Sequence, residues 1–249
     1  MYGCLRKRVG ASRVEVVVVR ETSQIADPLV GTVRVTVAAM LAFACALGVA
    51  VALYPGHDAH VHGYRFCYDF ISALGVTRTP GGLDNHRACW IFNVALGTAM
   101  LVLIPYWYVR SRHVRGPLGV RLLAFLCCAG FSLGVLGVAL SPYDLRPDMH
   151  NLCIYSAFAL IVPGVLLLLL ASDRALCGWR YRIAWCVFAV SLLLCEWYLV
   201  TLVGRHVLPS RPVNPLIQKA NVGAFIAWLA TDLALFSTYV RRPKGVVCS

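Results

Sequence analysis

Histidine and aspartate side chains gather in three polar segments of the chain, residues 55–87, 142–150 and 205–220. These segments hold six of the seven histidines and five of the eleven acidic residues. Imidazole and carboxylate groups together can bind a metal ion or act as a general acid and base. The same residue types also form helix caps and solvated loops, so their number alone does not decide between a site and ordinary polarity.

His150 has the clearest position of this set. It follows Asp148 and precedes Asn151, where a long apolar segment begins. Asp or Asn caps a helix at such a start, but a cap gives no reason for a titratable histidine beside it. We therefore expect His150 to be the acid or base of any catalytic site. Its tentative catalytic partners are Ser72, Asp84 and Asp144, and the tentative ligand-binding residues are Asp69, Asn85 and Asn93.

Known cofactor and metal motifs give no further guidance. The run His57-Asp58-Ala59-His60-Val61-His62 has loop spacing that could capture a metal ion, but the sequence fixes no fourth ligand. The chain has no Walker loop, dinucleotide fingerprint, nucleophile elbow or HExxH motif. We therefore assign neither a metal nor a cofactor.

The composition narrows the class of protein. Hydrophobic residues make up 59% and charged residues 14% of the 249 residues, and the mean hydropathy is +0.72. Soluble domains are about a quarter charged, so the composition excludes a soluble globular, disordered or nucleic-acid-binding protein. The formal net charge of +12 is typical of Lys and Arg retained at the cytoplasmic membrane face. The expected partners are membrane lipids.

Six apolar segments are long enough to cross a membrane, which takes roughly 20 residues. They are residues 33–54, 88–109, 118–141, 151–171, 184–204 and 221–240. The sequence thus predicts an all-α, multi-pass membrane domain over residues 33–240. A flexible basic segment, residues 1–32, precedes this domain, and a basic tail, residues 241–249, follows it.

The basic residues orient these spans. One set of flanks, together with Arg34 and Arg121, holds 16 Lys and Arg, and the other set, of nearly equal length, holds 7. The positive-inside rule places the richer set, and with it both termini, in the cytoplasm of a cell-membrane protein. The three polar segments then face the outer side. The clearest inner anchors are Arg110, Arg112 and Arg115 in one short loop.

Two acidic residues fall inside the predicted spans, Glu196 in the fifth and Asp232 in the sixth. Each costs about 2.5–3.5 kcal/mol on insertion scales, so it should face the interior and be paired or protonated. No Lys or Arg occupies the middle of a span, so we expect hydrogen-bonding partners such as Asn93, Ser132, Ser156, Tyr198 and Thr201. A proton relay and a protonated or water-bridged structural contact both remain open.

The segment Tyr64–Gly75 in the first outer loop has helical periodicity. Five apolar residues fall within a stripe of about 140°, while Asp69 and Ser72 project from the opposite side. The sequence therefore predicts a short amphipathic helix on the outer surface. Such a helix would roof the bundle and could line a site there.

Several short motifs resemble a known family. Ile71-Ser72-Ala73-Leu74-Gly75, Asp84-Asn85 and Ile91-Phe92-Asn93 resemble a stretch of the membrane proteins grouped as domain of unknown function 998, and so do Ser141-Pro142-Tyr143-Asp144 with Met149-His150-Asn151. The chain departs from the family pattern at Ala73, where Asp is expected, and at Ser141, where Phe is expected. The six-span plan is similar to that of damage-regulated autophagy modulators and of the post-attachment factor for glycosylphosphatidylinositol anchors. By analogy of fold alone, the resemblance implies lipid handling.

Three functions fit these observations. The first is a polar outer pocket that binds or modifies a lipid or amphiphile headgroup and is lined by Ser72, Asp84, Asn93, Asp144 and His150. In this pocket we expect Ser72, Asn93 and His150 to lie within the reach of one small headgroup, roughly 10 Å, and Asp84 or Asp144 to hydrogen-bond the imidazole. The second is a proton-coupled transporter that uses Glu196 and Asp232, although the spans show no pair of matching broken helices. The third is a non-catalytic scaffold or assembly factor.

The charge distribution generates a prediction about topology. In a cysteine-labelling scan with a membrane-impermeant reagent, His57→Cys should react from outside the cell. His113→Cys should react only after the membrane is opened, because it lies beside the basic inner loop. The opposite labelling pattern would overturn the argument from charge.

Overall fold

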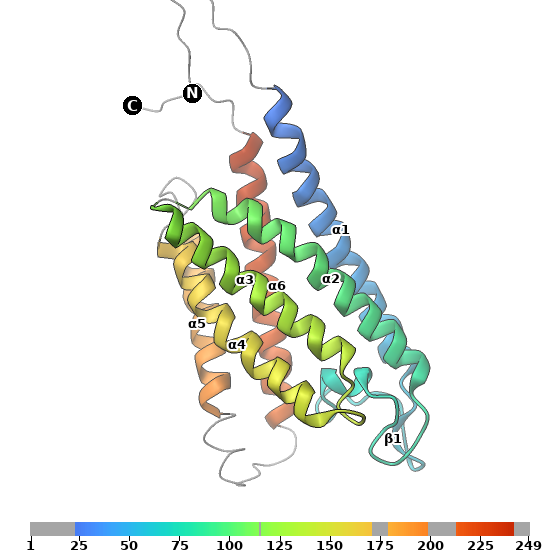
Figure 1. Ribbon diagram of the computed structural model, residues 1–249. Coiled ribbons are helices and arrows are strands. Elements are labelled where there is room, and N and C mark those ends of the chain that lie inside the picture. The colour runs from blue at the N-terminus through green and yellow to red at the C-terminus, as the bar shows by residue number, and fades with distance from the viewer. Residues whose placement is uncertain (1–22, 115, 171–178, 199–212, 242–249) are drawn as a thin grey trace, which may run out of the picture.

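The computed structural model describes residues 23–114, 116–170, 179–198 and 213–241 (Figure 1). This part of the chain is mostly helical, as expected for an all-α protein. Its helices are α1 (Ser23–Leu53), α2 (His86–Arg112), α3 (Leu118–Leu140), α4 (Pro147–Leu170), α5 (Trp179–Tyr198) and α6 (Val213–Arg241). Strands β1 (Gly56–Asp58) and β2 (Val61–His62) form a small antiparallel hairpin, and η1 (Ile71–Gly75) is a short 3-10 helix.

Five helices are long and apolar enough to cross a membrane: α1, α2, α3, α4 and α6. The described apolar part of α5, Trp185–Leu194, is shorter. Large apolar side chains on the outside of the bundle, such as Leu118 and Leu170, are exposed. Exposing such an apolar surface to water is unfavourable, whereas contact with lipid is not. The chain therefore has the character of a multi-pass membrane protein.

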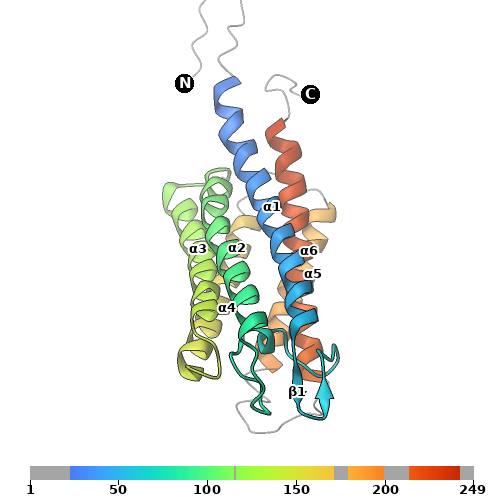
Figure 2. The same cartoon turned by 90° about the vertical axis from the view of Figure 1, so that its right-hand side faces the viewer.

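The helices pack in chain order. Each of α1, α2 and α3 lies against the next helix, α5 pairs with α6, and α6 returns to α1 (Figures 1 and 2). Helices α1 and α6 lie side by side and extend beyond the other helices at one end (Figure 2). The opposite end carries the connection between α1 and α2, and we call it the loop end.

Small residues bring α3 and α4 into close contact. A Cβ atom added to Gly134 would lie 2.8 Å from the Cβ atom of Ala157, and one added to Gly137 would lie 2.5 Å from the Sγ atom of Cys153. Glycine at these positions lets the two backbones approach, as in other membrane helix pairs. Helix α3 therefore presents a small-residue face to α4.

Aromatic side chains fill the interior between the α5–α6 pair and the other helices. The ring of Trp228 on α6 is stacked on Trp107 of α2, with centroids 5.9 Å apart, and on Phe188 of α5, at 5.1 Å. Trp185 meets it edge-on. Large planar rings span a gap that smaller side chains would leave open, so they join α6 to both halves of the bundle.

The first loop differs from the amphipathic helix predicted over Tyr64–Gly75. Only Ile71–Gly75 is helical, and it is a 3-10 helix. The predicted faces are also reversed at two positions, because Asp69 is buried while Phe66 is 64% exposed. The carboxylate of Asp69 accepts a hydrogen bond from the backbone N–H of Arg65 at 2.7 Å. This contact closes a turn where a regular helix would have continued.

Two other sequence predictions concern the N-terminal segment and residues outside the described part of the chain. Helix α1 begins at Ser23, ten residues before the predicted span, so part of the segment expected to be flexible is helical. Several residues named in the sequence analysis lie outside the described part: residues 1–22, Arg115, residues 199–212, which include Thr201 and His206, and the tail after Arg241. The side chains of Glu196 and Tyr198 lie outside it as well.

Candidate functional site

Residues 54–85, which we call the loop cap, have little regular structure. Their backbone is bound by the side chains of Asn85, which directly precedes α2, and of Asn93 in α2. The side chain of Asn85 donates to the carbonyl oxygen of Val76 at 2.8 Å, and it lies 3.4 Å from the carbonyl of Leu74. The side chain of Asn93 donates to the carbonyl oxygen of Gly75 at 3.0 Å. Two of the three residues proposed as ligand-binding, Asn85 and Asn93, therefore hold the end of η1 against α2.

Gly75 is the point of closest approach between η1 and α2. A Cβ atom at this position would lie 2.8 Å from the Oδ1 atom of Asn93 and 3.2 Å from the ring of Phe92. The thiol of Cys89 also donates to the Gly75 carbonyl, at 3.2 Å. Only glycine leaves room for this contact, so close packing against α2 explains the glycine at this position.

Asp144, in the turn between α3 and α4, binds the loop cap from the other side. Its carboxylate accepts hydrogen bonds from the backbone N–H of Thr77 at 3.0 Å, the hydroxyl of Thr77 at 2.5 Å and the backbone N–H of Arg78 at 3.0 Å. Partial burial acts to raise the pKa of Asp144, but these hydrogen bonds outweigh it and hold the pKa below its ordinary value. The ionised carboxylate is therefore the form that binds the cap.

Helix α6 makes the third attachment of the loop cap. The side-chain oxygen of Gln218 accepts from the backbone N–H of Ile71 at 2.7 Å, and its nitrogen lies 3.4 Å from the hydroxyl of Ser72. The ammonium of Lys219 donates to the carbonyl oxygen of Asp69. The same ammonium lies over the rings of Tyr64 and Phe66, about 5 Å from their centroids.

Asp84 and the hairpin lie at the exposed edge of the loop end. The carboxylate of Asp84 pairs with the Nδ1 atom of His86, and its side chain is 75% exposed. Hydrogen bonding from His86 holds the pKa of Asp84 below its ordinary value. Asp58 accepts hydrogen bonds from the N–H groups of His60 and Val61, so it closes the hairpin turn. Within the described residues, no group of three or more His, Cys, Asp or Glu side chains could hold a metal ion.

His150 is buried in the first turn of α4, with 5% of its surface exposed. Its Nδ1 atom lies 2.8 Å from the carbonyl oxygen of Ser141, so it carries the proton and donates. The ring of Tyr143 stands edge-on to the imidazole. This hydrogen bond fixes the tautomer, and Nε2 has no hydrogen-bond partner in the described part of the chain.

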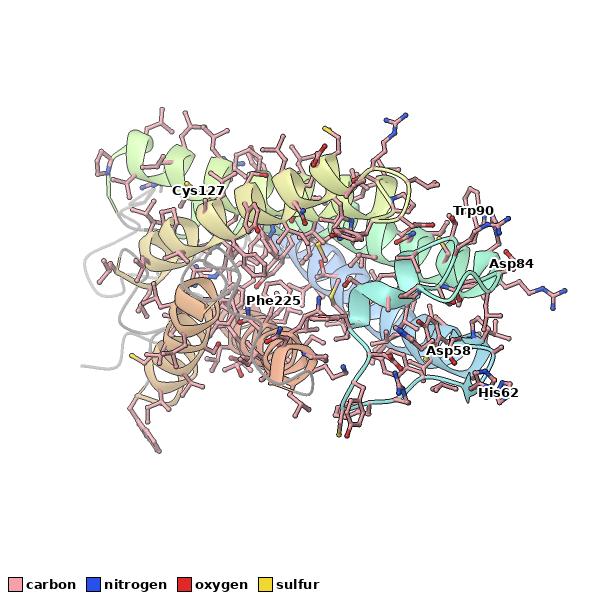
Figure 3. All side chains as sticks on the ribbon, turned by 90° about the horizontal axis from the view of Figure 1, so that it is seen from below. Asp58, His62, Asp84, Trp90, Cys127 and Phe225 are labelled. Carbon is pink, nitrogen blue, oxygen red and sulfur yellow. The ribbon has the colours of Figure 1, made fainter. Side chains whose placement is uncertain are left out.

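The predicted environment of His150 was wrong in one respect. We expected Asp84 or Asp144 to bind the imidazole, but Asp84 pairs with His86, Asp144 binds Thr77, and a backbone carbonyl takes their place. The three polar segments do meet at one end through these contacts, and Figure 3 shows Asp58, His62 and Asp84 on one side of the molecule. The convergence of Ser72, Asn93 and His150 within the reach of one headgroup stays a prediction.

The buried acid Asp232 has a partner that the sequence analysis missed. The Nε atom of Arg110 lies 3.2 Å from the carboxylate of Asp232, and the hydroxyl of Tyr106 donates to the same carboxylate. Arg110 is 1% and Asp232 2% exposed. The expectation that no cation reaches Asp232 was therefore wrong, and Arg110 is not an inner lipid anchor.

A local signal could have identified this pair. Helix α2 continues to Arg112, so Arg110 follows Tyr106 by four residues on the same helical face. Among the residues whose side chains are described, the partners expected for the two acids bind elsewhere. Ser132 accepts from the indole of Trp107, and Ser156 donates to a carbonyl of its own helix.

Comparison of the chain with protein-family models, with curated proteins and with solved structures finds no match.

The hydrogen bonds of Asp144 predict how the loop cap responds to pH. Because the pKa of Asp144 is lower when the cap is bound, its contribution is present at neutral pH. It is lost as the pH falls below about 4. The protection factor of the amides in a peptide covering residues 76–80, obtained by correcting the measured exchange rate for the intrinsic rate at each pH, should therefore fall at acidic pH. Asp144→Asn should lower this protection factor already at neutral pH, whereas Asp148→Asn, at the start of α4, should not. Equal exchange in the two variants would contradict this role.

The ion pair predicts an asymmetric response to mutation. Asp232→Asn should destabilise the protein by about 3–5 kcal/mol, because it leaves the buried charge of Arg110 without a counter-ion. The double variant Arg110→Met with Asp232→Leu should be more stable than either single variant. Thermal unfolding in detergent measures this difference. Wild-type stability of Asp232→Asn would show that the carboxylate is protonated in the native protein.

Proposed function

We propose that the protein is a six-span membrane protein of the plasma membrane that binds the headgroup of a lipid or amphiphile at its loop end. In this proposal α5 continues into the fifth span, both termini are cytoplasmic and the loop end faces outwards. The five apolar helices and the density of basic residues in the other flanks support this orientation. The resemblance to domain of unknown function 998 is part of the same proposal.

The observation that carries the proposal is the imidazole of His150. It is buried at the start of a span, its Nδ1 atom is anchored on Ser141, and Nε2 remains available as an acceptor. The hydrogen bond of Nδ1 fixes the direction in which Nε2 points. An acceptor with a fixed direction suits a hydroxyl or ammonium group of a headgroup. Because no carboxylate contacts this ring among the described residues, the arrangement favours binding over general acid–base catalysis.

The attachments of the loop cap support the same function. Asn85, Asn93, Asp144 and Gln218 hold the cap backbone in one arrangement, so residues that face a ligand would be preorganised. These contacts also fit a scaffold that presents a rigid cap to a partner.

The proton-coupled transporter is the second candidate function. The burial of Asp232 with Arg110 and Tyr106 favours it, because a buried ionisable group inside a span marks many ion pathways.

Two isosteric substitutions of His150 test headgroup binding. In His150→Asn the amide nitrogen takes the place of Nδ1 and keeps the bond to Ser141, but nothing replaces Nε2. In His150→Gln the amide takes the place of Nε2, and the bond to Ser141 is lost. We expect His150→Asn to fold normally and to lose co-purified lipid, with affinity reduced about tenfold for one hydrogen bond. His150→Gln should retain part of the binding with lower stability.

Native mass spectrometry from nanodiscs of defined lipid composition provides the measurement. His86→Asn is the matched control, because His86 is exposed at the same end and pairs only with Asp84 in the described structure. Binding that is unchanged in His150→Asn would exclude His150 from the site. The scaffold would then be the better account.

A further inference from the structure

We propose that ordered water lines the interior face of α6 and connects the loop end with the buried carboxylate of Asp232. This inference does not depend on headgroup binding at His150. It starts from two polar side chains of α6, Asn221 and Trp228, which point into the bundle. Asn221 is 6% and Trp228 1% exposed.

Each of these side chains has an unused polar atom. The Oδ1 atom of Asn221 and the Nε1 atom of Trp228 are fully buried and have no hydrogen-bond partner in the described part of the chain. One is an acceptor and the other a donor, and water, which both donates and accepts, can bind to either of them. A buried polar atom without a partner costs about 1–3 kcal/mol, and inside a membrane it cannot turn to bulk solvent. Water bound at such atoms removes this cost.

The two atoms belong to a polar stripe along one face of α6. At 100° per residue, Gln218, Asn221, Trp228 and Asp232 fall within roughly 80° of one another. Asn221 and Trp228 are about 10 Å apart along the helix axis, and Trp228 and Asp232 about 6 Å. A stripe of this kind on an otherwise apolar helix runs from the loop cap to the ion pair. Phe225, on the same face, lies in the middle of the bundle (Figure 3).

The two ends of the stripe differ in character. At the loop end, Gln218 and Lys219 are only partly buried and bind the loop cap, so solvent has a route to them. At the other end, the carboxylate of Asp232 already binds Tyr106 and Arg110. The unused atoms of Asn221 and Trp228 lie between these ends. Water bound to these atoms would complete a hydrogen-bonded connection from the loop end to Asp232. Such water would give Asp232 access to the outer side, which a proton-coupled transporter needs.

A neighbouring tryptophan provides an internal reference. The indole N–H of Trp107 donates to the hydroxyl of Ser132 at 2.9 Å, and its ring is stacked on that of Trp228. The two indoles thus share one aromatic cluster, but only Trp228 lacks a protein acceptor among the described residues. Any global opening of the bundle would accelerate exchange at both indoles, whereas local water would accelerate exchange at Trp228 alone.

Solvent exchange of the indole protons tests the proposal. The experiment uses the full chain labelled with 15N-tryptophan in nanodiscs, and single Trp→Phe substitutions assign the NMR signals. We expect the Trp228 indole to exchange about tenfold faster than that of Trp107, the factor that one hydrogen bond of ordinary strength provides. Asn221→Leu, which removes the polar group at nearly constant volume, should slow Trp228 to the Trp107 rate.

Thr231→Val serves as the matched control. Its hydroxyl is on the same helix but binds the carbonyl of Ala227 on the exposed side, so this variant should exchange like the wild type. Equal rates for Trp228 and Trp107 in the wild-type protein would overturn the proposal. A Trp228 rate that Asn221→Leu leaves unchanged, or that Thr231→Val lowers equally, would also overturn it. Loss of lipid in the His150 variants would not affect these rates, so the two proposals fail separately.

Discussion

The loop cap has little regular structure, so its backbone N–H and C=O groups need hydrogen-bond partners from other segments. The arrangement of the loop end depends on this requirement. An irregular segment beside a membrane cannot leave buried N–H and C=O groups unpaired. Side chains from α2, from α6 and from the turn between α3 and α4 therefore bind it, namely Asn93, Gln218 and Asp144, and Asn85 binds it at the junction with α2. These contacts bring segments more than 60 residues apart in the sequence to one end of the bundle.

Buried charges in the interior also need partners. Arg110 and Asp232 are both buried, and each would be costly without the other. The hydroxyl of Tyr106 adds a neutral donor, and the rings of Trp107 and Phe188 stack on Trp228 nearby. The pair joins α2 to α6, two helices that are far apart in the chain. It thereby complements the contacts of Gln218 and Lys219 at the other end of α6.

Several residues that suggested chemistry in the sequence have structural tasks in the fold. Asp58 closes a hairpin turn, Asp69 closes the turn before η1, and Asn85 holds the end of η1. Residue type alone could not separate these tasks from catalysis, because a carboxylate that accepts backbone N–H groups and one that activates a histidine are the same group. His150 remains the candidate because its second ring nitrogen is not used by such a contact.

The sequence by itself determined the helical class, the approximate bounds of the helices and the small-residue face of α3. These features depend on the hydrophobicity of continuous segments and on small residues at helical spacing, which are local properties. Only the tertiary structure decided that Arg110 turns inwards to Asp232, that Tyr64–Gly75 is not one helix, and that a carbonyl and not an aspartate binds His150. Each of these outcomes depends on a partner from a distant segment. Periodicity within one segment carries no information about which distant donor or acceptor will lie beside it.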